Sequence, residues 1–239
     1  MNLVLFEPAE IGRPLPRADR RARHVLDVLR RKVGDTFDAG VINGPRGKAT
    51  LVALDALTLT LSVAADKSPL TAEPIMRIVG LPRPQTARDI LRDATTLGVS
   101  AIHFVRTDKG DANYAQSSLW SAGKWRRHVV AGAEQAFTTR VPDVIHGHSL
   151  AEAIVTLPPS ATRLALDNYE SPTSLGQLSS LAGHAIALAI GGERGWSAAE
   201  RDLLRAQNFT LVHLGPRVLR TETACTAALA IIRAKLGLL

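Results

Sequence analysis

Along residues 75–236, short apolar runs alternate with stretches in which apolar residues recur at helical spacing. The apolar runs predict buried strands at 75–81, 102–105, 163–167, 185–190 and 210–214. The other stretches predict helices at 86–97, 120–136, 149–156, 175–181, 197–206 and 221–236. Because strands and helices alternate, we predict an α/β fold with a largely parallel sheet covered by helices. Ligands of such sheets bind at the loops that follow the carboxyl ends of the strands.

The first part of the chain has a different, mostly β pattern. Strand-like runs occur at 36–40, 49–54 and 57–64, and one amphipathic helix is predicted over roughly 19–31. A polar stretch with two prolines, 66–74, follows and is typical of a linker. We therefore expect two domains, residues 1–68 and residues 75–239.

The charge of the chain suggests a polyanionic partner. The 239 residues carry a formal net charge of +7, and residues 1–48 hold ten Lys and Arg against six Asp and Glu. A chain this basic is a candidate for binding nucleic acid, although a basic soluble protein without such a partner fits the composition equally well. The polar side of the 19–31 helix is either a solvated face or a phosphate-binding one. Its candidate RNA-binding residues are Arg20, Arg23, Arg30 and Arg31.

Several function classes find no support in the sequence. The single cysteine, Cys225, excludes an internal disulfide and a cysteine-based zinc site, and favours a reducing, cytoplasmic setting. The first ten residues lack the features of a signal peptide, and no apolar stretch approaches the length of a membrane span. The segment 44–48 has the wrong spacing for a phosphate-binding loop and predicts a β-turn. His146-Gly-His148 offers two imidazoles without a third ligand and predicts a plain loop.

Two loops between a predicted strand and a predicted helix concentrate unusual residues. The first, 190–197, contains three glycines and ends at Ser197, which forms a capping box with Glu200 at the start of a helix. Glycines let the backbone approach a ligand closely, but a tight strand–helix turn has the same pattern. The second loop, 214–224, carries Arg217, Arg220 and Glu222 where a ligand of the sheet should lie. Surface ion pairing is the alternative for these arginines. The helix behind it, 221–236, is apolar on most sides, which predicts burial, in part in a dimer.

The two loop motifs together resemble one family. Leu-Gly-Pro-Arg-Val-Leu-Arg-Thr-Glu-Thr at 214–223, after Ile-Gly-Gly-Glu-Arg-Gly-Trp-Ser-Ala-Ala-Glu at 190–200, closely resembles the ribosomal RNA small subunit methyltransferase E family. These enzymes are uracil-N3 methyltransferases of 16S rRNA in the SPOUT superfamily. Weaker similarity runs along nearly the whole chain. It includes residues 24–30, Gly34-Asp35, residues 97–99, Glu134-Gln135 and residues 140–142.

The resemblance implies a fold, a cofactor and partners. It implies an N-terminal PUA-like RNA-binding β-barrel and a C-terminal SPOUT-type α/β domain with a deep trefoil knot, a rare exception to the rule that chains do not thread loops. It also implies S-adenosylmethionine (SAM) as methyl donor without a metal, the 16S rRNA of the small ribosomal subunit as substrate, and a homodimer. The residues expected to bind the cofactor are Leu166, Asp167, Gly191, Gly192, Glu193, Gly195, Leu214, Gly215, Val218, Leu219 and Thr223.

The expected chemistry assigns roles to three residues of the second loop. Loss of the proton from uracil N3 puts negative charge on N3 and the flanking carbonyl oxygens, and a guanidinium aimed there would stabilise it. We expect Arg220, then Arg217, to supply that guanidinium. Glu222 is a base or orients an arginine, and the sequence leaves the choice open.

The chain departs from the family pattern at several positions. Gly192 stands where the family has proline and Arg194 where it has glycine. Asp93 and Thr96 replace the usual Lys and Glu, and Thr138 replaces an arginine. These departures leave other hypotheses open: a catalytically silent RNA-binding or ribosome-assembly protein on the same fold, or a methyltransferase with a different RNA target. A third is an α/β enzyme acting on a phosphorylated small molecule, which the missing phosphate motif disfavours.

Overall fold

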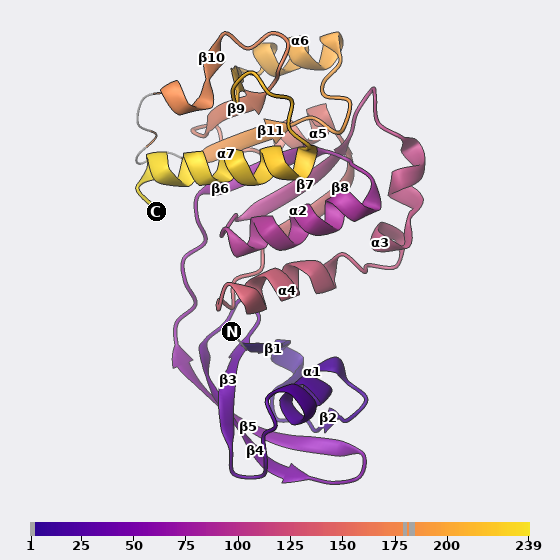
Figure 1. Cartoon of the computed structure of the whole chain (residues 1–239), viewed down its shortest axis with the longest axis vertical. Coiled ribbons are helices and arrows are strands. Elements are labelled where there is room, and N and C mark those ends of the chain that lie inside the picture. Colours follow the sequence, from indigo (N-terminus) through magenta and orange to yellow (C-terminus); the bar gives the residue numbers. More distant parts are fainter. Residues whose placement is uncertain (1–2, 179–180, 182–184) are drawn as a thin grey trace. The chain divides into compact units, whose positions relative to one another are not determined.

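The computed structural model describes residues 3–178, 181 and 185–239. Two compact units make up the chain (Figure 1). The first unit comprises residues up to Thr71 together with Ala133–Val141, and the second comprises Ala72–Gly132 and Pro142–Leu239. The segment 133–141, which carries the Glu134-Gln135 motif, thus belongs with the first unit. No helix among the described residues is long and apolar enough to cross a membrane.

The first unit is built on a five-stranded sheet in the order β1-β3-β4-β5-β2. β1 pairs parallel with β3, and the other described pairs are antiparallel. The apolar core lies on one side of this sheet and includes Phe6, Phe37, Leu51 and Leu59. The three predicted strands are present with longer bounds, and β1 and β2 are additional. The strands are β1 (Val4–Phe6), β2 (Leu15–Pro16), β3 (Thr36–Val41), β4 (Arg46–Leu54) and β5 (Thr58–Lys67).

The helix predicted over 19–31 is shorter and less regular than expected. Asp19 caps α1 (Arg20–Arg23), which passes directly into one π-helical turn, η2 (His24–Val28). Arg30 has a φ of +52°, so the helix cannot continue to residue 31. The π turn brings Val25 into the core, where it is fully buried. The predicted β-turn at 44–48 is also misplaced, because the turn spans residues 42–44 and Arg46–Lys48 already belong to β4.

A half-buried guanidinium fixes the start of this helix. Arg21 pairs with Glu10, in the short helix η1 (Pro8–Glu10), at 2.7 Å and with Asp19 at 2.8 Å, and donates to the carbonyl of Leu5 at 3.2 Å. Its hydrogen bonds lower the pKa of both carboxyls. Arg21 is therefore a structural residue of the first unit, whereas its neighbours Arg20 and Arg23 extend into solvent.

The second unit contains a seven-stranded sheet in the order β10-β12-β9-β11-β6-β7-β8, and every described pairing in it is parallel. The predicted parallel sheet covered by helices is confirmed. All five predicted strands are present within two residues of their expected bounds, as β6 (Ile75–Gly80), β7 (Ala101–Arg106), β9 (Thr162–Leu166), β11 (Ile186–Ile190) and β12 (Thr210–His213). The two edge strands, β8 (Asp143–Ser149) and β10 (Thr173–Ser174), were not predicted.

The interpretation of His146-Gly-His148 as a plain loop is wrong. These residues lie in β8, and Gly147 has a φ of +90° where the register with β7 shifts. The bulge interrupts the alternation that would have marked a strand. His146 lies against the ring of Trp120, with ring centroids 5.0 Å apart.

Helices cover the parallel sheet on both faces. α2 and α7 lie side by side on one face (Figure 1). α5 and α6 belong to a second apolar cluster, with Ile78, Ala187 and Trp196 from the sheet and its loops. The predicted helix at 120–136 is broken because Gly123 adopts a φ of +62°. The helices are η3 (Ala112–Gln116), α2 (Pro84–Thr96), α3 (Ser118–Ser121), α4 (Arg126–Gln135), α5 (Leu150–Val155), α6 (Ala198–Ala206) and α7 (Thr221–Leu236).

One predicted helix lies partly outside the described residues, and two further predictions about the fold are not tested. The helix expected at 175–181 begins as a single 3-10 turn, η4 (Leu175–Gln177), after which Leu178 is extended. Residues 179 and 180 lie outside the described residues. The trefoil knot and the PUA-like barrel stay predictions.

The single cysteine lies in the interior of the second unit. Cys225, on α7, is 1% exposed, and Arg77 of β6 is also 1% exposed. Burial raises the pKa of the Cys225 thiol, although the nearby Arg77 guanidinium opposes the shift. The thiol is therefore neutral and inaccessible in the folded chain.

Three histidines with lowered pKa values predict a loss of stability in mild acid. Burial lowers the pKa of His103, His128 and His146 below the ordinary value. The unfolded chain therefore binds more protons than the folded chain once the pH falls below about 6.5, and the free energy of unfolding should decrease from there. Urea unfolding at about pH 7.5, 6.5 and 5.5 measures this. The lowered pKa values of the Glu10 and Asp19 carboxyls affect the free energy of unfolding only below about pH 4.5. Equal stability at pH 7.5 and 5.5 would contradict the prediction, and His103→Leu should flatten the decline.

Candidate cofactor-binding site

Three loops of the second unit meet at one edge of its sheet. β12, β9 and β11 are adjacent and parallel, so the loops that follow Leu166, Ile190 and His213 leave the sheet on the same side. They enclose a cavity of about 800 Å³. The cavity lies where ligands of parallel sheets are expected, beyond the carboxyl ends of the strands.

Most of the residues predicted for the site line this cavity. Arg217, Arg220 and Glu222, the expected catalytic residues, are among them. Gly215 and Thr223 do not line it. The expected cofactor-binding residues that do are Leu166, Asp167, Gly191, Gly192, Glu193, Gly195, Leu214, Val218 and Leu219.

A fourth segment, from the residue before α2 into the first turns of that helix, was not predicted. Arg83, Gln85, Thr86 and Asp89 also line the cavity. β6 is the parallel neighbour of β11, so its carboxyl end opens onto the same edge of the sheet. The available signal was the position of Pro82-Arg83-Pro84 directly after a predicted strand, but the sequence does not reveal that β6 neighbours β11.

The backbone of the glycine loop after β11 packs closely against other backbone, both within the loop and in β6. A Cβ atom added to Gly191 would lie 2.8 Å from the Cα of Gly195, and one added to Gly80 of β6 would lie 2.5 Å from the nitrogen of Gly192. Gly195 has a φ of +62°, and its N–H donates to the carbonyl of Gly192 at 2.9 Å. No side chain fits at Gly191 or Gly80, so main chain packs directly on main chain at these points.

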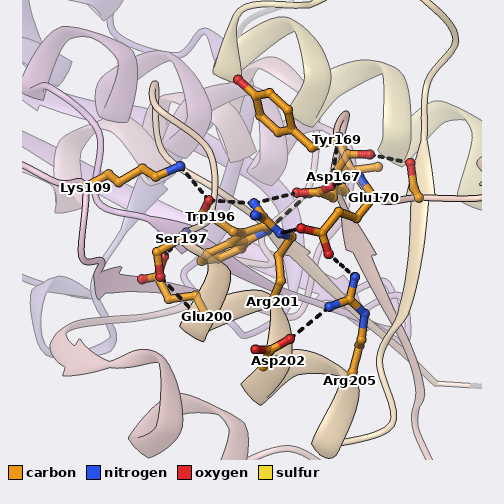
Figure 2. Close-up of polar contacts among 12 residues, drawn as sticks. Lys109, Asp167, Tyr169, Glu170, Trp196, Ser197, Glu200, Arg201, Asp202 and Arg205 are labelled. Atoms are coloured by element: carbon orange, nitrogen blue, oxygen red, sulfur yellow. Dashed lines mark hydrogen bonds and ion pairs between the residues drawn. The ribbon is translucent and has the colours of Figure 1, made fainter.

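Trp196 ties the glycine loop to the neighbouring strand. Its side chain is fully buried, and its Nε1 donates to the carbonyl of Leu166 at 3.1 Å. The Trp196 carbonyl accepts from Lys109 Nζ at 2.8 Å and from Arg201 Nη1 at 3.0 Å (Figure 2). The loops after β9 and β11 are therefore held in one fixed relation.

The carboxylate of Asp167 shapes the loop after β9. Asp167 is 5% exposed, and its Oδ1 accepts from the backbone N–H groups of Tyr169 at 2.9 Å and Glu170 at 2.7 Å. On α6, Arg201 lies 2.7 Å from the Glu170 carboxylate, and Arg205 also pairs with it (Figure 2). Arg205 lowers the pKa of Glu170. Asp167 thus holds the backbone of its own loop in place.

The start of α6 is fixed by the predicted capping box. Ser197 Oγ accepts from the Glu200 backbone N–H at 3.1 Å, and Glu200 Oε2 accepts from the Ser197 N–H at 2.8 Å. Glu200 also accepts from the backbone N–H of Asp108 at 2.9 Å, which links the loop after β7 to the same helix. The capping box predicted from the sequence is confirmed.

The loop before α7 presents two arginines to solvent. The Arg220 side chain is 86% exposed, and its Nη1 lies 4.0 Å from Glu222 Oε1. Arg217 is exposed, and Val218 is 83% exposed although its side chain is apolar. Gly215 has a φ of +102°, and its N–H donates to His213 Nδ1 at 3.0 Å, which turns the chain away from β12. This wall of the cavity therefore carries two exposed cations and one exposed apolar residue.

Glu193 has a structural partner in the same cavity. Its Oε1 accepts from the backbone N–H of Arg83 at 2.9 Å and lies 3.3 Å from Arg83 Nε. Arg83 precedes the first residue of α2, so the bond connects the glycine loop to the start of that helix. Arg194, the next residue, is exposed.

Comparison with known proteins identifies the family. Residues 69–233 match a family model described as an RNA methyltransferase domain. The chain is 35% identical to Ribosomal RNA small subunit methyltransferase E of Treponema pallidum, over 98% of this chain and 91% of that protein. This chain belongs to the ribosomal RNA small subunit methyltransferase E family. The resemblance drawn from the two loop motifs is thereby confirmed.

Other members of the methyltransferase E family match over their full length. Ribosomal RNA small subunit methyltransferase E 1 of Borreliella burgdorferi is 25% identical, over 99% of both chains. A crystal structure of a Ribosomal RNA small subunit methyltransferase E from Neisseria gonorrhoeae bound to S-adenosyl methionine has 25% identity and a TM-score of 0.75. The match covers 99% of this chain and 98% of that one. The α/β fold of this chain is thus shared with the family along its whole length.

The bond from Trp196 to Leu166 yields a test of the loop architecture. Trp196→Phe removes the Nε1 donor and leaves the buried Leu166 carbonyl without its partner, which should cost about 1–3 kcal/mol of unfolding free energy beyond the lost volume. Trp120→Phe is the matched control, because Trp120 is 4% exposed and its Nε1 has no partner among the described residues. Urea unfolding of both variants measures the difference. Equal destabilisation would show that the bond does not hold the loops.

Proposed function

We propose that this chain transfers the methyl group of SAM to N3 of a uridine in the 16S rRNA of the small ribosomal subunit. The observation that carries the proposal is the cavity enclosed by the three loops, whose residues carry the two motifs of the methyltransferase E family. The relatives named above support methyl transfer to small-subunit rRNA as the reaction. The choice of uracil N3 follows from the family resemblance of the motif at 214–223.

The cavity suits a nucleoside that is recognised through main-chain groups. The wall at Gly191–Gly195 admits no Cβ at its closest points, so an adenosine could approach the backbone directly. Leu166, Leu214 and Leu219 contribute apolar surface for an adenine ring. Bound there, SAM supplies an electrophilic methyl group on a sulfonium, which needs no metal for its transfer. Among the described residues, no group of His, Cys, Asp and Glu is arranged to hold a metal ion.

The residues of the chain have to align the acceptor and handle its proton. Arg220 and Arg217 extend from the loop before α7 into the cavity region, where a guanidinium can stabilise the charge left on the uracil oxygens. Glu222 lies in the first turn of α7, 4.0 Å from Arg220, so it can orient that guanidinium.

RNA binding is assigned to the first unit. Arg20 pairs with Glu134 at 3.1 Å but its side chain stays 57% exposed, and Arg23 donates to the carbonyl of Ala18 at 2.8 Å. Arg30 and Arg31 are exposed at the end of the π-helical turn. Exposed arginines of this kind bind phosphates with an affinity that decreases steeply with salt.

The homodimer is part of the proposal and rests on the family resemblance. The apolar character of α7 alone does not require a second copy, because Cys225, Ala228, Leu229 and Ile232 are buried within the chain itself. The outer side of the helix carries Thr223, Thr226 and Ala230, whose small side chains permit close approach of another helix.

The glycine wall can be tested by adding a single methyl group. Gly191→Ala would place a Cβ 2.8 Å from the main chain of Gly195, so the loop must shift and its ligand-binding groups with it. We expect SAM affinity, measured by calorimetry on the full chain, to fall at least roughly tenfold, which corresponds to about 1.4 kcal/mol. Gly176→Ala is the control, because its Cβ would meet only Ser174 Oγ at 3.6 Å. Unchanged SAM affinity in Gly191→Ala would contradict the assigned cavity.

The role of Arg220 can be separated from substrate binding. If its guanidinium stabilises charge that develops only during transfer, Arg220→Ala should bind SAM and RNA nearly normally. The rate of single-turnover methylation of small-subunit rRNA should fall by roughly 100- to 1,000-fold. A variant that keeps its rate but loses RNA affinity would make Arg220 a phosphate anchor. Nucleoside mass spectrometry of the product identifies the methylated atom, and SAM binding without methylation of any rRNA would favour a catalytically silent RNA-binding protein.

A further inference from the structure

The first unit contains a second cavity, separate in sequence from the three loops, whose lining suits a nucleotide. We propose that an unpaired base of single-stranded RNA stacks on the ring of Phe137 in this cavity, with Arg31 and Lys48 beside its phosphate. The inference deepens the proposed function, because it presumes RNA as substrate. It concerns binding by the first unit only and is independent of the cofactor cavity.

The cavity has a volume of about 330 Å³, and its lining residues come from four parts of the chain. Leu29 and Arg31 follow the π-helical turn, Phe37 and Lys48 come from β3 and β4, and Phe137 comes from the segment 133–141. Thr36 and Asp38 complete the lining. Apolar surface, an aromatic ring and two cations therefore border one hollow, which is the composition of sites that bind single-stranded nucleic acid.

Phe137 is held in a backbone conformation that a bulky residue rarely adopts. Its φ is +56°, in the left-handed region. The following residues are anchored to the turn between β3 and β4. Thr139 Oγ1 donates to the carbonyl of Gly44 at 2.7 Å, and the N–H of Val141 donates to Asn43 Oδ1 at 2.9 Å. Strained backbone that the surroundings enforce is concentrated at functional positions. The Phe137 side chain is half-buried, so part of it stays open to solvent.

A guanidinium fixes the ring that the base would use. Arg46 Cζ lies 4.5 Å from the centroid of the Phe137 ring, and the same side chain donates to the Phe137 carbonyl. The two interactions hold the aromatic ring in one orientation while it lines the cavity. Unpaired bases stack both on phenylalanine rings and on arginine planes.

The rim of the cavity favours an anion. Lys48 pairs with Asp38 at 2.7 Å, so the two charges largely offset each other. Arg31 is exposed, and its side chain forms no ion pair within the part of the chain that the structure describes. Its backbone N–H donates to the carbonyl of Val25 at 3.0 Å, which fixes its position directly after the π-helical turn. The rim therefore keeps one uncompensated positive charge beside the aromatic ring.

Single-stranded RNA fits these features better than duplex RNA. A duplex keeps its bases paired and stacked, so it offers no free base face to Phe137, whereas an unpaired nucleotide offers both a base face and a phosphate. A subsite of this kind would read no particular sequence, because every base has a face that can stack. Its contribution would be to hold an unpaired stretch of the substrate near the first unit.

The test compares binding of the full chain to a fluorescein-labelled 12-nucleotide oligouridylate and to a blunt RNA duplex of the same length. Phe137→Asn removes the ring but tolerates the left-handed conformation. We expect its affinity for the oligouridylate to fall by roughly five- to 100-fold while the affinity for the duplex changes little. Phe137→Tyr should retain the wild-type affinity. Arg31→Gln should lower the salt slope of oligouridylate binding by about 0.7.

Controls separate this subsite from folding and from the proposed reaction. Phe209→Leu alters another phenylalanine near an arginine, with Arg163 Cζ 5.9 Å from its ring centroid, and should leave oligouridylate affinity unchanged. SAM affinity should be unchanged in Phe137→Asn, which shows that the variant is folded. If the wild-type chain binds the oligouridylate as expected but does not methylate rRNA, the proposed function fails and the subsite does not. Wild-type affinity of Phe137→Asn for the oligouridylate, or an equal loss for both RNAs, would overturn the subsite.

Discussion

The parallel register of β9, β11 and β12 is the constraint on which the rest of the second unit depends. Because these strands are neighbours that run in one direction, three loops distant in sequence must leave the sheet at one edge. The hydrogen bond from Trp196 to the Leu166 carbonyl then fixes two of those loops to each other. Without the common edge, the two motifs of the methyltransferase E family would have no shared cavity. The order of the strands thus determines where the cavity lies, and the side chains determine its lining.

Side chains near the cavity divide into those that shape it and those that face its contents. Asp167 accepts from backbone N–H groups of its own loop, whereas Glu193 and Glu200 accept from those of neighbouring segments. Arg217 and Arg220 have exposed side chains at the opening. A carboxylate that satisfies buried N–H groups is costly to remove, whereas an exposed arginine can change its orientation as a substrate arrives. Glu193 and Glu200 therefore have structural partners although they belong to the family motif.

The sequence predicted the elements with strong local signals and missed those that depend on distant partners. The apolar runs of β9 and β11 and the Ser197–Glu200 capping box are local, and all were found. β8 was missed because a bulge at Gly147 breaks its alternation. The position of the segment 133–141 depends on long-range bonds such as that of Arg20 to Glu134, which no local pattern reveals. Arg83 was missed for the same reason, since only the order of the strands brings it to the cavity.

The buried cysteine makes the chain well suited to site-directed labelling. Cys225 is the single thiol of the sequence, it is 1% exposed, and its raised pKa keeps it protonated. Maleimide reagents attack thiolates at accessible positions, so the native protein should leave them unconsumed. A cysteine introduced at an exposed position would then carry a fluorophore or spin label without removal of the native residue. The rate at which Cys225 itself is slowly labelled would then measure how often α7 separates from the sheet.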